Sequence, residues 1–148
     1  MSSLDLMERR VFYAGQDILK EGSPGRELFI IESGHVEIWK KAPQGKLVLE
    51  RLGPKRVFGE LGLIDDTGRS NNITAISDCV CRVIVGDDFK RRLLNTDPLV
   101  RALMRVMVES MRSLDGRIVE MVKKNGALPP DLPPPAAPPA AKPDPNKK

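Results

Sequence analysis

The chain has 148 residues, a net charge of +4 and 41% hydrophobic residues, which suits one globular domain with a modest core. The charge is too small to indicate nucleic-acid binding, and a single histidine argues against a histidine-ligated metal enzyme. Because no apolar stretch approaches the length of a membrane span or a signal peptide, we expect a soluble, cytoplasmic protein without a membrane segment.

The first ten residues are expected to contain a short helix over 2–10. From Val11 to Val85 the pattern instead indicates short strands, because apolar runs and period-two alternation are separated by glycine-containing turns. The expected strands include 18–19, 28–31, 35–39, 47–52, 73–76 and 79–85. Strands of this length and spacing predict a β-barrel or jelly roll of about eight antiparallel strands.

The two cysteines, Cys79 and Cys81, lie two residues apart on the last expected strand. Alternate strand residues share a face about 6.5 Å apart, which is a poor geometry for a disulfide. We therefore predict two reduced, partly buried thiols.

Helical periodicity begins after Gly86. Asp87 or Asp88 is expected to cap a short helix, and Asp97 to cap a long helix that starts at Pro98 and continues to about Lys124. Strands followed by helices make the predicted class α+β, with a short N-terminal helix and a long C-terminal one.

The long helix carries apolar residues at a spacing of 4, 3, 4, 3, 4, 3. The positions are Val100, Met104, Met107, Met111, Leu114, Ile118 and Met121, here called the seam. A seam of this regularity favours a parallel partner helix, so we predict a homodimer through this helix. The alternative is a helix that packs only on its own domain.

Three regions are predicted along the chain. Residues 1–96 form the β-domain with its short helices, 97–124 the long capping and dimerisation helix, and 125–148 a disordered tail. Nine of the 13 prolines lie in that last region, which has no core-forming pattern.

A candidate site follows the strand that ends at Phe58. Gly59 would let a ligand approach, and the turn after it would offer free backbone N–H groups to an anion. Glu60 is an acceptor suited to a sugar hydroxyl, whereas Arg69, nine residues on, carries a fixed fork of donors suited to phosphate. The spacing therefore fits a site for ribose plus phosphate, although a surface salt bridge between the two side chains stays open.

The order Phe58-Gly59-Glu60-Leu61, a short loop and then Arg69-Ser70 resembles the phosphate-binding cassette of the cyclic-nucleotide-binding domain family. This family includes catabolite-activator-type regulators and the regulatory subunits of cAMP-dependent kinase. The resemblance runs from about residue 8 to residue 95, and Gly15, Gly22, Gly25 and Gly34 stand at the family's turns.

The resemblance implies a role for each matching residue. Glu60 would hold the ribose 2′-hydroxyl, Arg69 would pair with the cyclic phosphate, and Ser70 would hold phosphate oxygens. The implied ligand positions are Val57, Gly59, Glu60, Leu61, Gly62, Arg69, Ser70, Asn71, Asn72 and Ile73. The long helix would cap the base, through Arg112, Ser113 or Arg117.

The ligand that the resemblance implies is cAMP, with cGMP as the alternative. Ser70 in place of threonine favours cAMP, whereas Asn71-Asn72 and Gly68 depart from the family's pattern and leave base selectivity open. We predict a regulatory module, not an enzyme, in which ligand binding reorients the long helix toward an unknown protein partner.

Nothing after Lys124 could fold into a helix-turn-helix, so we expect a stand-alone module without a DNA-binding domain. The alternative function is a scaffold that has lost its ligand and acts through protein–protein contacts.

Overall fold

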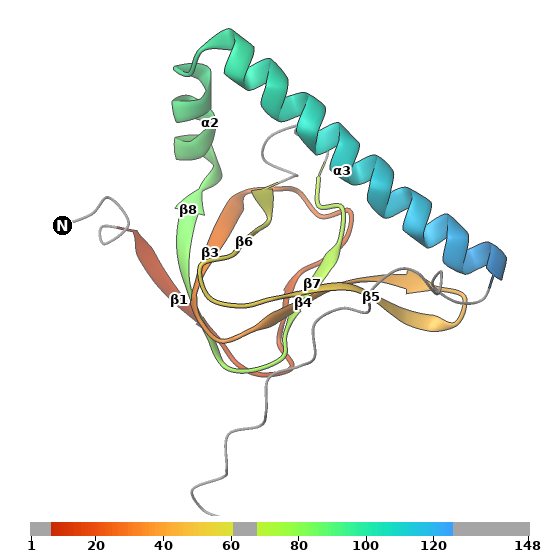
Figure 1. Cartoon of the computed structure of the whole chain (residues 1–148). Coiled ribbons are helices and arrows are strands. Elements are labelled where there is room, and N and C mark those ends of the chain that lie inside the picture. Colours follow the sequence, from red (N-terminus) through yellow and green to blue (C-terminus); the bar gives the residue numbers. More distant parts are fainter. Residues whose placement is uncertain (1–6, 61–67, 126–148) are drawn as a thin grey trace, which may run out of the picture.

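The computed structural model describes residues 7–60 and 68–125, in which short strands alternate with turns as predicted. The strands are β1 (Glu8–Phe12), β2 (Asp17–Leu19), β3 (Glu27–Ser33), β4 (Val36–Ala42), β5 (Gly45–Leu52), β6 (Val57–Phe58), β7 (Asn72–Ala75) and β8 (Cys79–Val85). They form two four-stranded antiparallel sheets in the orders β1-β8-β3-β6 and β2-β7-β4-β5. Two such sheets confirm the predicted α+β, jelly-roll-like class (Figure 1).

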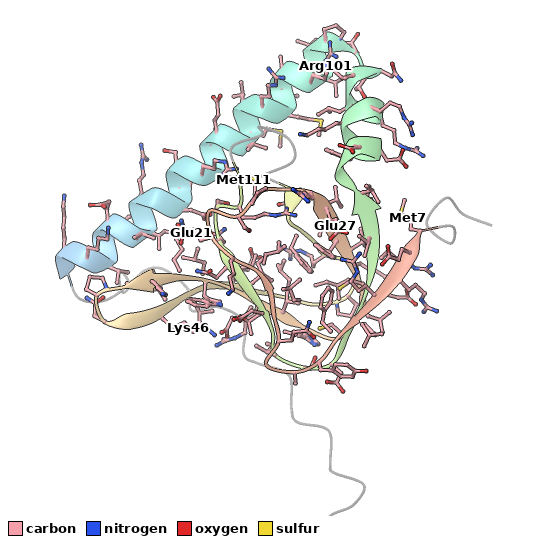
Figure 2. The ribbon with its side chains drawn as sticks, turned by 180° about the vertical axis from the view of Figure 1, so that it is seen from behind. Met7, Glu21, Glu27, Lys46, Arg101 and Met111 are labelled. Carbon is pink, nitrogen blue, oxygen red and sulfur yellow. The ribbon has the colours of Figure 1, made fainter. Side chains whose placement is uncertain are left out.

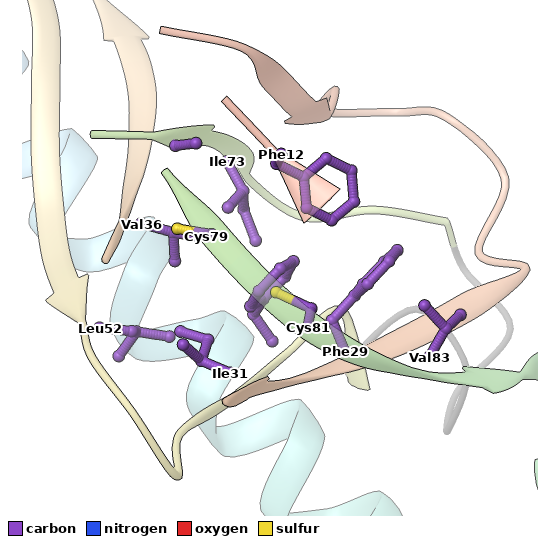
Figure 3. Packing of buried hydrophobic residues seen from close by; sticks show 11 residues of the cluster. Phe12, Phe29, Ile31, Val36, Leu52, Ile73, Cys79, Cys81 and Val83 are labelled. Atoms are coloured by element: carbon purple, nitrogen blue, oxygen red, sulfur yellow. The ribbon is translucent and has the colours of Figure 1, made fainter. Parts of the chain in front are cut away.

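Three phenylalanines organise the core between the sheets (Figure 3). The Phe29 ring stacks on Phe58 with centroids 4.9 Å apart and meets the edge of Phe12 at 5.7 Å. The other buried members are Ile31, Val36, Leu52, Ile73, Ala75, Cys79, Cys81 and Val83. Because Phe58 ends β6, its stacking on Phe29 fixes where the chain leaves the sheet at Gly59.

Both cysteines are free, as predicted, and they are fully buried, whereas the sequence predicted partial burial. Burial raises the pKa of Cys81 to about 12 and also raises that of Cys79. Thiolate chemistry is therefore disfavoured at both positions.

The helix predicted over 2–10 is wrong where the structure describes it. Residues Glu8–Phe12 form β1, which pairs with β8 from Glu8 opposite Val83 to Phe12 opposite Cys79. The pairing satisfies backbone hydrogen bonds and buries Phe12 to 6% exposure, so tertiary context overrides the weak local helix preference. The rest of that predicted helix, residues 2–6, lies outside the described residues.

Two helices follow the barrel, α2 (Gly86–Leu94) and α3 (Pro98–Asn125). Asp97 caps α3 as predicted, since its carboxylate accepts from the Leu99 N–H at 2.8 Å. The predicted cap of α2 is wrong: the helix begins at Gly86, Val85 occupies the capping position two residues before Asp87, and no side-chain hydrogen bond is made. The two aspartates instead lie in the first turn, where they favour the helix dipole.

Helix α3 runs across one side of the barrel, from the end of α2 to the β4–β5 hairpin (Figure 1). It is held there by two buried valines, Val108 and Val122, at 3% and 4% exposure. At the hairpin tip the Gln44 side-chain amide donates to the Val122 carbonyl at 3.2 Å. The predicted tail lies outside the described residues from residue 126 onward.

Candidate functional site

A cavity of about 390 Å³ lies between α3 and the barrel. Its walls come from β2, β4, β5 and β6, from the segment 69–73 and from the middle of α3. Figure 2 shows the part of α3 around Met111 beside the barrel rim. This volume falls within the range of small-molecule sites.

Arg69 is the most enclosed charge in the cavity wall, with 6% of its surface exposed. Its two terminal nitrogens donate to the backbone carbonyls of Gly59 and Glu27. Its Nε is buried and has no hydrogen-bond partner within the described part of the chain. Burial lowers the pKa of this guanidinium, an effect that the Glu27 and Glu60 carboxylates oppose. A buried donor without a partner is costly, so this position favours an anionic ligand.

The backbone of Arg69 is held by the turn at residues 22–23. The Arg69 N–H donates to the Ser23 carbonyl at 2.9 Å, and the Gly22 N–H donates to the Arg69 carbonyl at 2.8 Å. Gly68 precedes it with a φ of +85°, and a Cβ there would lie 3.2 Å from the Ser23 carbonyl. Glycine therefore suits this position for both reasons.

Behind Arg69, Glu27 is fixed by Arg10, whose two terminal nitrogens donate to its carboxylate at 2.8 and 2.9 Å. The same hydrogen bonds are the main reason that the pKa of Glu27 is lowered. The carbonyl that receives Arg69 therefore belongs to a residue whose side chain is already anchored.

Glu60 lies two residues after the end of β6 and lines the same cavity. Burial is the main cause that raises the pKa of its carboxyl group, and the nearby Glu50 raises it further. A half-buried carboxylate beside an open cavity is suited to accepting hydrogen bonds from a ligand.

The raised pKa predicts how pH changes stability without ligand. The folded protein holds the Glu60 proton at pH values where the unfolded chain has released it, so stability falls as pH rises above the ordinary carboxyl range. Glu60→Gln has no proton to lose. The free energy of unfolding of Glu60→Gln, relative to that of the parent, should therefore be higher at about pH 7 than at about pH 4. Urea unfolding at both pH values measures this difference, and a constant difference would contradict a raised pKa of Glu60.

The cavity brings together most residues predicted from the sequence. Those that line it are Val57, Gly59, Glu60, Arg69, Ser70, Asn71 and Ile73. Leu61 and Gly62 lie outside the described residues. Asn72 does not line the cavity, and its side-chain oxygen accepts instead from the Glu21 N–H at 3.0 Å.

The residues of α3 that line the cavity differ from those expected to cap the base. Arg112, Ser113 and Arg117 are absent from the wall, which α3 forms with Met111, Leu114, Asp115 and Ile118. Three of these four belong to the seam, so the apolar periodicity contained the signal for them. Asp115 carried no such signal; its carboxylate accepts from the Asn71 side-chain amide at 3.2 Å.

An ion pair at the cavity wall was also missed by sequence reasoning. Arg56 and Glu50 meet at 2.8 Å, with about half of each side chain exposed. They come from the loop before β6 and from β5, and no spacing in the sequence links them.

The model of the cyclic nucleotide-binding domain family matches residues 9–96, more than half of the chain. The chain belongs to this family. The matched residues include the strands, the segment that carries Glu60 and Arg69, and α2. The resemblance inferred from the sequence is therefore confirmed.

Relatives within the family are regulators by their names. The CRP-like cAMP-activated global transcriptional regulator of Mycobacterium tuberculosis is 29% identical over 112 residues, which cover 75% of this chain and 50% of that protein. The cAMP-dependent protein kinase regulatory subunit of Aspergillus fumigatus is 34% identical over 97 residues, or 66% of this chain and 23% of that protein. The chain thus spans half or less of these relatives.

Solved structures show the same fold. The cAMP-bound form of the EAL enzyme Bd1971 matches with a TM-score of 0.70 and 28% identity, over 80% of this chain and 32% of that one. Its cGMP-bound form matches with a TM-score of 0.67 and 30% identity, over 71% and 28%. One structural relative has therefore been solved with each of the two cyclic nucleotides.

Among residues 7–60 and 68–125, no group of three or more His, Cys, Asp and Glu side chains is placed to hold a metal ion. In the same described ranges, no helix is both long enough and apolar enough to cross a membrane.

Proposed function

We propose that the chain is a cyclic-nucleotide sensor that binds cAMP, with cGMP as the alternative ligand. The observation that carries the proposal is Arg69, a buried cation on the cavity wall whose Nε has no partner in the described residues. A cyclic phosphate supplies the negative charge and the acceptor oxygens that this position favours.

The cavity wall has chemistry for each part of the ligand. Arg69 pairs with the phosphate and Ser70 holds its oxygens, while Glu60 accepts from the ribose 2′-hydroxyl beside the Gly59 backbone. Apolar atoms of Ile73 and its neighbours on the cavity wall contact the base. The walls supply area for binding, and the few polar groups fix the ligand's orientation.

Isothermal titration of the purified chain with cAMP, cGMP and 5′-AMP tests the proposal. We expect micromolar or tighter binding of one cyclic nucleotide and much weaker binding of 5′-AMP, whose open phosphate carries an extra charge. Absence of heat with all three ligands, on folded and nucleotide-free protein, would favour the scaffold that acts through protein contacts.

Glu60→Ala should reduce the preference for a ribose ligand. The parent should bind cAMP about tenfold more tightly than 2′-deoxy-cAMP, because a hydrogen bond to the half-buried Glu60 carboxylate is lost in the deoxy ligand. The variant should bind the two nearly equally. Competition titrations give both ratios. A parent without preference for ribose would overturn the role of Glu60.

Ligand binding is proposed to reorient α3 by selecting one of its pre-existing positions. Support comes from the cavity, since Met111, Leu114 and Ile118 of α3 form part of its wall. A ligand that fills the cavity must contact both the barrel and the helix. Its affinity therefore differs between positions of α3, as any population shift requires.

We also propose a homodimer through the seam of α3. Five of its seven positions keep between 39% and 57% of their surface exposed, namely Val100, Met107, Met111, Leu114 and Met121. An exposed apolar stripe along a helix of 28 residues favours a second helix as its cover.

Met107→Glu tests the dimer, because it places a charge in the seam without touching the cavity wall. We expect the dimer dissociation constant to rise at least about tenfold, since two carboxylates would face each other in an apolar contact. Val106→Glu is the matched control, because Val106 is equally exposed, at 57%, but lies outside the seam. Sedimentation equilibrium measures both variants. Equal effects of the two substitutions would argue against the seam.

A further inference from the structure

The peptide group that precedes Arg69 is held from two sides. Its N–H donates to the Ser23 carbonyl at 2.9 Å, and its carbonyl, which belongs to Gly68, accepts from Nη2 of Arg112 at 3.1 Å. The first contact comes from the barrel and the second from α3. The orientation of this one peptide plane therefore depends on both parts of the molecule.

The same face of α3 makes a second contact with this part of the barrel. It lies three residues further along the helix and three residues further along the segment that contains Arg69. Asp115 follows Arg112 by three positions, so the two side chains project from neighbouring turns of the helix. The Asp115 carboxylate accepts from the Asn71 amide at 3.2 Å. One turn of α3 thus contacts the residues on either side of Arg69-Ser70.

Arg112 itself does not line the cavity. An effect of Arg112 on a ligand can instead pass through its hydrogen bond to the Gly68 carbonyl, which belongs to the peptide that precedes Arg69. A guanidinium on a carbonyl is a charge-assisted hydrogen bond, which fixes the peptide more firmly than a neutral donor would.

We infer that Arg112 is a positioning residue for Arg69, and that the Asp115–Asn71 contact secures the same segment at its other end. Through these contacts α3 sets the backbone from which Arg69 reaches the carbonyls of Gly59 and Glu27. The consequence for nucleotide affinity rests on the proposed function; the consequence for the backbone does not.

Amide hydrogen exchange on the nucleotide-free protein tests the backbone consequence. In Arg112→Leu the Arg69 N–H should exchange about tenfold faster, because its peptide has lost one of its two fixed ends. Arg112→Lys should restore part of the protection. The Ala75 N–H, which donates to the Gln16 carbonyl at 2.9 Å, is the reference amide and should not change.

Arg117→Leu is the matched control, because it removes the same charge from an exposed position of the same helix. Unchanged exchange at Arg69 in Arg112→Leu, or an equal increase in Arg117→Leu, would overturn the inference. A general loss of protection that includes Ala75 would also overturn it, since Arg112 would then support the whole fold and not this segment. Arg112→Lys keeps the experiment decisive if the leucine variant does not fold.

Nucleotide binding supplies the second readout. The probes are cAMP, cGMP and the two phosphorothioate forms of cAMP, in which sulfur replaces one or the other exocyclic phosphate oxygen. Arg112→Leu should reduce the parent's preference between the two phosphorothioates and leave the ratio of cAMP to cGMP affinity unchanged. The reverse pattern would make Arg112 a base contact and overturn the inference. If the parent binds none of these probes, the proposed function fails, and the exchange experiment alone decides the role of Arg112.

Discussion

Arg69→Ala should weaken cAMP binding by about 100-fold or more, because the phosphate loses a charge-assisted partner that is itself buried from solvent. Arg69→Lys should fall between the parent and the alanine variant, since lysine keeps the charge but not the planar fork of donors. Isothermal titration measures the three affinities, and a competition format extends the range for the weakest of them.

Arg56→Ala is the control for this prediction. Arg56 also lines the cavity, but 58% of its side chain is exposed and it is paired with Glu50. Screening by solvent makes such a charge worth little, so its loss should change affinity by less than about threefold. Circular dichroism of Arg69→Ala must show a folded protein, because the carbonyls of Gly59 and Glu27 lose their donor in this variant. Binding of cAMP by Arg69→Ala as tightly as by the parent would refute the assignment of the phosphate site.

Gly59→Ala should lower the free energy of unfolding by about 2–3 kcal/mol and should also impair nucleotide binding. Gly59 has a φ of +85°, and a Cβ there would lie 2.8 Å from Nη1 of Arg69 and 3.1 Å from the Glu27 carbonyl. The substitution therefore combines backbone strain with displacement of the guanidinium. Urea unfolding and titration with cAMP measure the two effects.

Gly15→Ala separates strain from crowding. Gly15 has nearly the same φ, +87°, but no atom lies within 4 Å of the added Cβ. We expect a loss of only about 1–2 kcal/mol, from the left-handed conformation alone, and unchanged nucleotide affinity. If the two alanine variants lost equal stability and bound nucleotide equally, crowding of Arg69 by a side chain at position 59 would affect neither stability nor binding.

The sequence predicted those parts of the fold that depend on residues close together in the chain. The start of α3 is an example, because Asp97 and Pro98 act within one turn of helix. The same holds for the short strands, whose alternation follows from one face being buried. The cassette also belongs here, since Gly59, Glu60 and Arg69 are joined by one short stretch of chain and line one cavity.

The N-terminal strand shows where local patterns are insufficient. Residues Glu8–Phe12 have no strong strand signal, and they are extended because β8 offers them a hydrogen-bonding edge more than 60 residues away in the chain. Pairing with a distant strand decides this case. The α2 cap was misplaced for a different reason, because β8 ends at Val85 as predicted and leads straight into the helix at Gly86 without a side-chain cap.

The sequence by itself determined the family, the order of the strands and helices that follow β1, and the two side chains proposed to bind ribose and phosphate. Only the tertiary structure decided which face of α3 closes the cavity, because a periodic apolar stripe fits a partner helix and a cavity wall equally well. It alone showed that Arg112 reaches the Gly68 carbonyl and that Asp115 meets Asn71, 44 residues apart in both pairs. Contacts over such separations depend on how α3 packs on the barrel, and no spacing along the chain encodes them.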